Sequence, residues 1–147
     1  MFEKAGGKNH ETIAVIRHPV EWLWSWYSYR NRHSLVGHEN STRNVKFNEF
    51  ALEYCKDNPA AFAAVGSQSA FVFDHHGKRA TTQLFAYEHQ PALIAFLEQR
   101  LDTTITLKQL NVSPTIPTVI DPEVEAHLRA AKPLEFAAYN EAISTSA

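Results

Sequence analysis

Arg17 and Ser25 are the residues of this chain whose types and spacing point most directly to a chemistry. Arg17 follows a short apolar run, IAVI at residues 13–16, and Ser25 comes eight residues after it in a stretch that begins with Pro19. A guanidinium can bind two phosphate oxygens at once and keeps its charge at physiological pH. If a strand ends at Arg17 and a helix carries Ser25, both side chains can converge on one anion.

Two elements must position this pair. The apolar run predicts a buried strand at residues 12–17, and Pro19 favours the first turn of a helix that continues to about residue 32. An arginine directly after a strand lies at its carboxyl end, where open α/β sheets bind ligands. The polar stripe of the helix, within about 60° on a helical wheel, consists of Glu21, Ser25, Ser28 and Arg32. This stripe either meets solvent or faces a ligand groove next to Arg17, and Arg17 could instead form an ion pair with Glu21.

The rest of the sequence alternates short apolar runs with helical patterns. Strands are expected at residues 69–73 and 81–87, on either side of a turn at 74–78. Helices are expected at residues 47–56, 60–65, 91–101, 122–131 and 133–143. This order favours a single α/β domain over residues 1–147, rich in helix and with few strands.

Composition limits the classes of function. A net charge of −2 gives no basic excess for nucleic-acid binding, and no apolar run approaches the roughly 18 residues of a membrane span. The only cysteine, Cys55, cannot form an internal disulfide, which predicts a cytoplasmic chain. Its helical context favours a plain helix position over a nucleophile. His75 and His76 lack nearby cysteine or acidic partners in sequence, so we expect a surface turn and no metal site.

The segment Arg17-His18-Pro19, with Ser25 and the aromatic pair after it, resembles the 3′-phosphate-binding segment of sulfotransferases. These enzymes use 3′-phosphoadenosine 5′-phosphosulfate (PAPS) as the sulfuryl donor. In that family an arginine at a strand end precedes a proline by two residues and a serine by eight. The resemblance implies that Arg17 and Ser25 hold the 3′-phosphate of the nucleotide. His18 departs from the family pattern, which often has Asp, Asn or Glu at this position.

Weaker similarities follow in the order found in the family, and together they cover residues 12–113. They are Gln68, the Tyr87-Glu88 pair with the helix after it, and Asn111-Val112-Ser113. The chain resembles small bacterial sulfotransferase-like proteins. The resemblance implies transfer of a sulfuryl group from PAPS to a hydroxyl or amine of a small-molecule or carbohydrate acceptor, with adenosine 3′,5′-bisphosphate leaving. It assigns no catalytic base and requires no metal. Glu88 could be a base, although a strand-end cap is the favoured interpretation.

The family's phosphosulfate-binding loop, which follows its first strand, has no counterpart in the sequence. Gly6-Gly7-Lys8 is not a P-loop, because no strand precedes it and no hydroxyl residue follows the lysine. We therefore expect a P-loop-type sulfotransferase-like fold that lacks its first strand and its phosphosulfate-binding loop. The sequence does not decide whether such a chain is catalytically active. The alternative is a non-catalytic remnant or interaction domain with a partial phosphate pocket. Its exposed sheet edge could pair two copies of the chain. A γ-glutamyl kinase assignment, found on some similar proteins, has no support in the residues.

Overall fold

The computed structural model describes residues 11–107 and 119–145. Over these residues the order of strands and α-helices is β1 Ile13–Ile16, α1 Pro19–Arg30, α2 Phe47–Tyr54, α3 Ser69–Val72, β2 Gln83–Ala86, α4 Gln90–Leu101, α5 Pro122–Ala131 and α6 Pro133–Thr145. Short 3-10 turns occur at His33–Leu35, Ala61–Ala63 and Tyr87–His89. The described part of the chain is therefore rich in helix, as expected.

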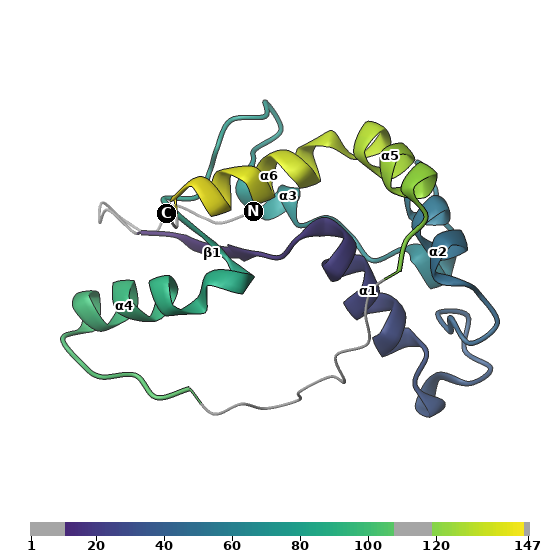
Figure 1. Cartoon of the computed structure of the whole chain (residues 1–147), viewed down its shortest axis with the longest axis horizontal. Coiled ribbons are helices and arrows are strands. Elements are labelled where there is room, and N and C mark those ends of the chain that lie inside the picture. The colour runs from purple at the N-terminus through teal and green to yellow at the C-terminus, as the bar shows by residue number, and fades with distance from the viewer. Residues whose placement is uncertain (1–10, 108–118, 146–147) are drawn as a thin grey trace.

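The two strands form a small parallel sheet. Ile13 pairs with Gln83 at one end of the register, and Ile16 pairs with Ala86 at the other. Helix α6 crosses this sheet on one side and packs against both strands, while α4 leaves from the end of β2 on the other side (Figure 1). A parallel pair requires a long crossover connection, here with α1, α2 and α3 in it. This arrangement confirms a mixed α/β architecture with few strands.

Two hydrophobic clusters hold these layers together. One joins α1, α2 and α5, with Leu23 and Phe50 completely buried and Leu128 nearly so. Several aromatic rings of α1 pack onto this cluster, and the ring of Trp24 meets that of Phe47 edge-on at 4.9 Å. The second cluster lies between the sheet and α6, and it contains Ile16, Val72, Leu84, Ala86, Ala138 and Ala142. The aromatic residues of α1 are thus accounted for mainly by packing.

Most of the predicted helices are confirmed. Helices α1, α5 and α6 begin at a proline, and α4 has Pro91 within its first turn, where a missing N–H leaves no intrahelical hydrogen bond unmade. The stretch at residues 60–65 forms only the 3-10 turn Ala61–Ala63, after which Gly66 adopts a φ of +81°, a conformation that favours glycine. The Asn111-Val112-Ser113 element lies outside the described residues.

One strand prediction is wrong, and another is wrong in part. Residues 69–73 were expected as a strand, but Ser69–Val72 forms the single-turn helix α3, because the backbone N–H groups at its start bond to a distant carboxylate. The strand β1 exists but is not buried along its length. Its Ile13 and Val15 are 41% and 42% exposed, because side chains alternate along a strand and these two lie on the face opposite Ile16, which packs against α6.

Candidate functional site

Arg17 lies at the carboxyl end of β1, in the turn that leads into α1, which is the place predicted for it. Its backbone N–H donates to Oε1 of Gln68 at 3.0 Å, and Nε2 of Gln68 donates to its carbonyl oxygen at 2.9 Å. Gln68 is only 6% exposed. A buried amide side chain therefore holds the backbone of Arg17 at both its donor and its acceptor.

The side chain of Arg17 is half-buried and incompletely satisfied. Its guanidinium carbon lies 4.9 Å from the centre of the Tyr87 ring, and Nη2 lies 4.0 Å from Oε2 of Glu21. Its Nε is buried and has no hydrogen-bond partner among the described residues, which is unusual for a buried donor. The ion pair with Glu21, one of the interpretations left open by the sequence, is therefore present but long.

Ser25 lies in the middle of α1 with its side chain exposed. No hydrogen bond of its hydroxyl is found among the described residues, and no direct contact joins it to Arg17. Glu21 lies one turn before Ser25 on the same face of the helix, and so stands between Ser25 and Arg17. The polar stripe thus meets solvent at Ser25. Between Ser25 and Arg17, the two predicted anion ligands, lies the turn of α1 that carries Glu21.

Glu88 acts as a cap at this turn. Its Oε1 accepts a hydrogen bond from the backbone N–H of His18 at 3.1 Å. The imidazole of His18 meets the rings of Phe136 and Tyr139 edge-on, at 6.1 Å and 5.0 Å. Glu88 and α6 therefore both contact the segment after Arg17. The hydrogen bond from the His18 N–H agrees with the interpretation of Glu88 as a cap.

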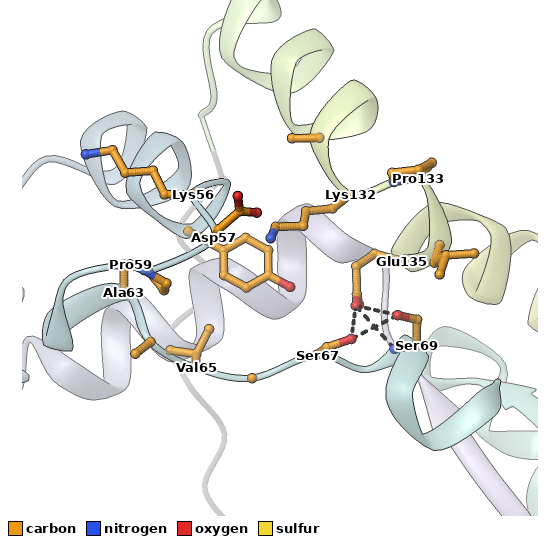
Figure 2. A pocket seen from close by; sticks show the side chains of 15 residues that line it. Lys56, Asp57, Pro59, Ala63, Val65, Ser67, Ser69, Lys132, Pro133 and Glu135 are labelled. Atoms are coloured by element: carbon orange, nitrogen blue, oxygen red, sulfur yellow. Dashed lines mark hydrogen bonds between the residues drawn. The ribbon is translucent and has the colours of Figure 1, made fainter. Parts of the chain in front are cut away.

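Glu135 is the residue of this region that the sequence did not reveal. It lies in the first turn of α6 and is 3% exposed. Its carboxylate accepts hydrogen bonds from the hydroxyl of Ser67 and from both the N–H and the hydroxyl of Ser69, at 3.3 Å and 2.8 Å (Figure 2). It also accepts one from the N–H of Gln68 at 3.1 Å. Gln68 is thus hydrogen-bonded on two sides. Its backbone N–H donates to the Glu135 carboxylate, and its side-chain amide bonds to the backbone of Arg17. A glutamate at the start of an ordinary helix gives no sequence signal of such a role.

The other candidates from the sequence do not form sites in the described part of the chain. His75 and His76 lie in a turn with their rings 3.8 Å apart. Nowhere in residues 11–107 and 119–145 do three or more His, Cys, Asp or Glu side chains form a group that could hold a metal ion. Arg30, the last residue of α1, is not among the candidates named above and has a structural role, because its guanidinium donates to the carbonyl oxygens of Ala61 and Ala64 at 2.6 Å and 3.0 Å.

Cys55 is a structural thiol at the end of α2. Its Sγ donates to the carbonyl oxygen of Ala51 at 3.2 Å, and burial raises the pKa of the thiol above its ordinary value. Because the thiolate is the reactive form, a raised pKa lowers its fraction at a given pH. We expect iodoacetamide to alkylate Cys55 at pH 8 more slowly in the folded chain than in urea, as followed by mass spectrometry. Equal rates in the two states would show that the fold does not protect this thiol.

Comparison with protein-family models, with curated proteins and with solved structures finds no match for this chain. The site is therefore interpreted from its own residues. Among the described helices, none combines the length and the apolar character needed to cross a membrane.

Proposed function

We propose that this chain is a sulfotransferase-like protein in which Arg17 and Ser25 bind the 3′-phosphate of PAPS or of adenosine 3′,5′-bisphosphate. The observation that carries the proposal is the position of Arg17. Its guanidinium lies at the carboxyl end of a strand in a parallel sheet, on a backbone that Gln68 holds at two points. Ligands of open α/β sheets bind at this end of the strands.

The electrostatics of the turn are compatible with an incoming phosphate. The ion pair between Arg17 and Glu21 is long, at 4.0 Å, and both side chains are more than 30% exposed, at 32% and 42%. Such a pair contributes little free energy, at most about 1 kcal/mol. A phosphate that accepts two charge-assisted hydrogen bonds from the guanidinium can displace it.

Ser25 is the second phosphate ligand of the proposal. It lies one turn after Glu21, the ion-pair partner of Arg17, at a rise of about 6 Å along α1. The proposal requires one phosphate to accept hydrogen bonds from both the guanidinium and this hydroxyl. The exposed hydroxyl of Ser25 makes no hydrogen bond to another described residue that the phosphate would have to replace.

Under this proposal the co-substrate is PAPS, and the acceptor is a hydroxyl or amine of a small molecule or carbohydrate. Arg17 and Ser25 anchor the nucleotide at its ribose phosphate. Sulfuryl transfer also needs positive charge or N–H donors around the transferring group. Neither Arg17 nor Ser25 is assigned to that task, and no residue is assigned as the base.

The test is calorimetric titration of the whole chain with adenosine 3′,5′-bisphosphate. We expect weak, saturable binding that becomes at least about tenfold weaker in Arg17→Ala, because a charge-assisted hydrogen bond contributes about 1.5–3 kcal/mol. The matched control is Arg43→Ala, which removes an exposed arginine outside this turn and is expected to leave the affinity unchanged. Equal affinities of the native chain and Arg17→Ala would remove the proposed role of Arg17.

One observation favours the alternative of a non-catalytic interaction domain. The exposed Ile13 and Val15 of β1 border an open groove of about 1380 Å³, which also runs past Phe71 and Phe73. An edge strand without a charged or proline residue is suited to pairing with another strand. A chain that sediments as a dimer and gives no heat with the nucleotide would favour this alternative.

A further inference from the structure

A second pocket lies away from Arg17, between the end of α2, the segment at residues 59–69 and the junction of α5 with α6 (Figure 2). It has a volume of about 460 Å³, within the range of about 300–1,000 Å³ typical of small-molecule sites. Much of its wall is apolar, and these residues are Pro59, Ala63, Ala64, Val65, Ala131, Pro133 and Leu134. Neither Arg17 nor Ser25 lines it.

Two opposite charges face this pocket without ion-pair partners. Lys132 and Asp57 extend into it from opposite walls (Figure 2). In the described part of the chain neither has an oppositely charged group within 4.0 Å, so they are not paired with each other. By contrast, the ammonium of Lys56, on the same rim, points away and pairs with Glu53 at 2.5 Å.

The hydroxyl of Tyr54 adds a third polar group at the pocket. Tyr54 lines the pocket and is only 5% exposed as a whole, but its hydroxyl oxygen is not among the buried atoms that lack a partner, and it makes no hydrogen bond to any described residue. Nζ of Lys132 lies 5.3 Å from the centre of its ring. This hydroxyl therefore reaches the open space of the pocket, where a ligand can accept a hydrogen bond from it.

The remaining carboxylate at the pocket is already occupied. Glu135 accepts hydrogen bonds from Ser67, Gln68 and Ser69, as described above, and so is committed to the fold. The groups free to meet a ligand are therefore one ammonium, one carboxylate and one phenolic hydroxyl beside an apolar wall. An anion alone would leave Asp57 unpaired, and a cation alone would leave Lys132 unpaired.

The geometry points to a binding site for an apolar amino acid. The carboxylate of the ligand accepts hydrogen bonds from Nζ of Lys132 and the hydroxyl of Tyr54, its ammonium group donates to Asp57, and its side chain lies against the wall formed by Pro59 and Val65. The two charges of such a zwitterion match the two unpaired charges of the pocket. This inference does not depend on the nucleotide site at Arg17.

The experiment compares three probes with the same isobutyl side chain by ligand-observed NMR with the whole chain. L-Leucine carries both charges, 4-methylpentanoate carries only the carboxylate, and 3-methylbutylamine carries only the ammonium. We expect saturable binding of L-leucine and binding at least about tenfold weaker for each single-charge probe, because each leaves one charged group without a partner. No binding of L-leucine, or equal binding of a single-charge probe, would overturn the proposal.

Variants locate the binding. Lys132→Met and Asp57→Asn remove one charge each from exposed or half-buried positions, and each is expected to weaken L-leucine binding about tenfold or more. The matched control is Lys56→Met, whose ammonium faces away, and it should bind as the native chain does. Tyr54→Phe removes only the unpartnered hydroxyl and should weaken binding while circular dichroism confirms an intact fold. Unchanged affinity in both Lys132→Met and Asp57→Asn would place the ligand elsewhere and refute the assignment.

Discussion

Replacement of Glu135 by alanine is expected to lower the free energy of unfolding by about 3 kcal/mol or more, because it leaves the buried N–H groups of Gln68 and Ser69 without an acceptor. Each unsatisfied buried donor costs about 1–3 kcal/mol. The hydroxyls of Ser67 and Ser69 lose this acceptor as well, although one of them can still donate to the other. Urea denaturation followed by circular dichroism measures the loss.

Two further variants make this result interpretable. Since a domain of this size is stable by only about 5–15 kcal/mol, Glu135→Gln provides a milder change in case the alanine variant does not fold. It retains one acceptor oxygen but turns an amide NH2 group toward a donor, and should cost about 1–3 kcal/mol. The control is Glu125→Ala, which breaks only the surface pair with Arg129 and should cost less than about 1 kcal/mol. A loss of unfolding free energy in Glu135→Ala no larger than that in Glu125→Ala would show that the buried carboxylate contributes no more to stability than a surface carboxylate does.

Replacement of Phe50 by alanine is expected to lower the free energy of unfolding by about 3–5 kcal/mol, the usual cost of deleting a large buried ring. Phe50 is fully buried at the centre of the cluster that joins α1, α2 and α5. Its ring meets those of Tyr27 and Phe47 at centroid distances of 5.7 Å and 6.4 Å. The alanine variant leaves a cavity that these neighbours fill only in part. Thermal and urea denaturation measure the effect.

Phe71→Ala is the matched control for this change, because it removes the same ring from a position that is 73% exposed. Surface substitutions of this kind usually change stability by less than about 0.5 kcal/mol. Similar losses in Phe50→Ala and Phe71→Ala would contradict the assignment of the core to the helical cluster.

The helices were predictable because their signals are local. A proline in the first turn and apolar residues three and four apart are both visible in the sequence, and α1, α4, α5 and α6 follow them closely. The parallel pairing of β1 with β2 agrees with the expected strand-and-helix alternation. The finer assignment to a P-loop-type sulfotransferase-like fold stays a prediction.

The failed predictions depend on contacts between distant parts of the chain. Residues 69–73 end in Phe, Val and Phe, types that favour a strand, yet Ser69 begins α3 because a carboxylate 66 residues away bonds to its N–H. The exposure of Ile13 and Val15 likewise depends on whether another element covers their face of β1, which an apolar run cannot reveal.

The candidate site was predictable in its position but not in its surroundings. The type of Arg17 and its place after an apolar run located it at a strand end, and the structure has it there. The part played by Gln68 and Glu135 in holding that turn requires contacts over 51 and 67 residues, respectively. The pocket at Tyr54 and Lys132 is formed by three separate segments, so no single stretch of sequence predicts it.

The central claim is that the guanidinium of Arg17 binds the 3′-phosphate of the nucleotide. A cycle of four affinities tests it most directly, with the native chain and Arg17→Ala each titrated with adenosine 3′,5′-bisphosphate and with adenosine 5′-monophosphate. We expect Arg17→Ala to weaken the bisphosphate by about tenfold or more while leaving the monophosphate unchanged, because the two ligands differ only in the 3′-phosphate. The same loss for both nucleotides, or for neither, would contradict the account.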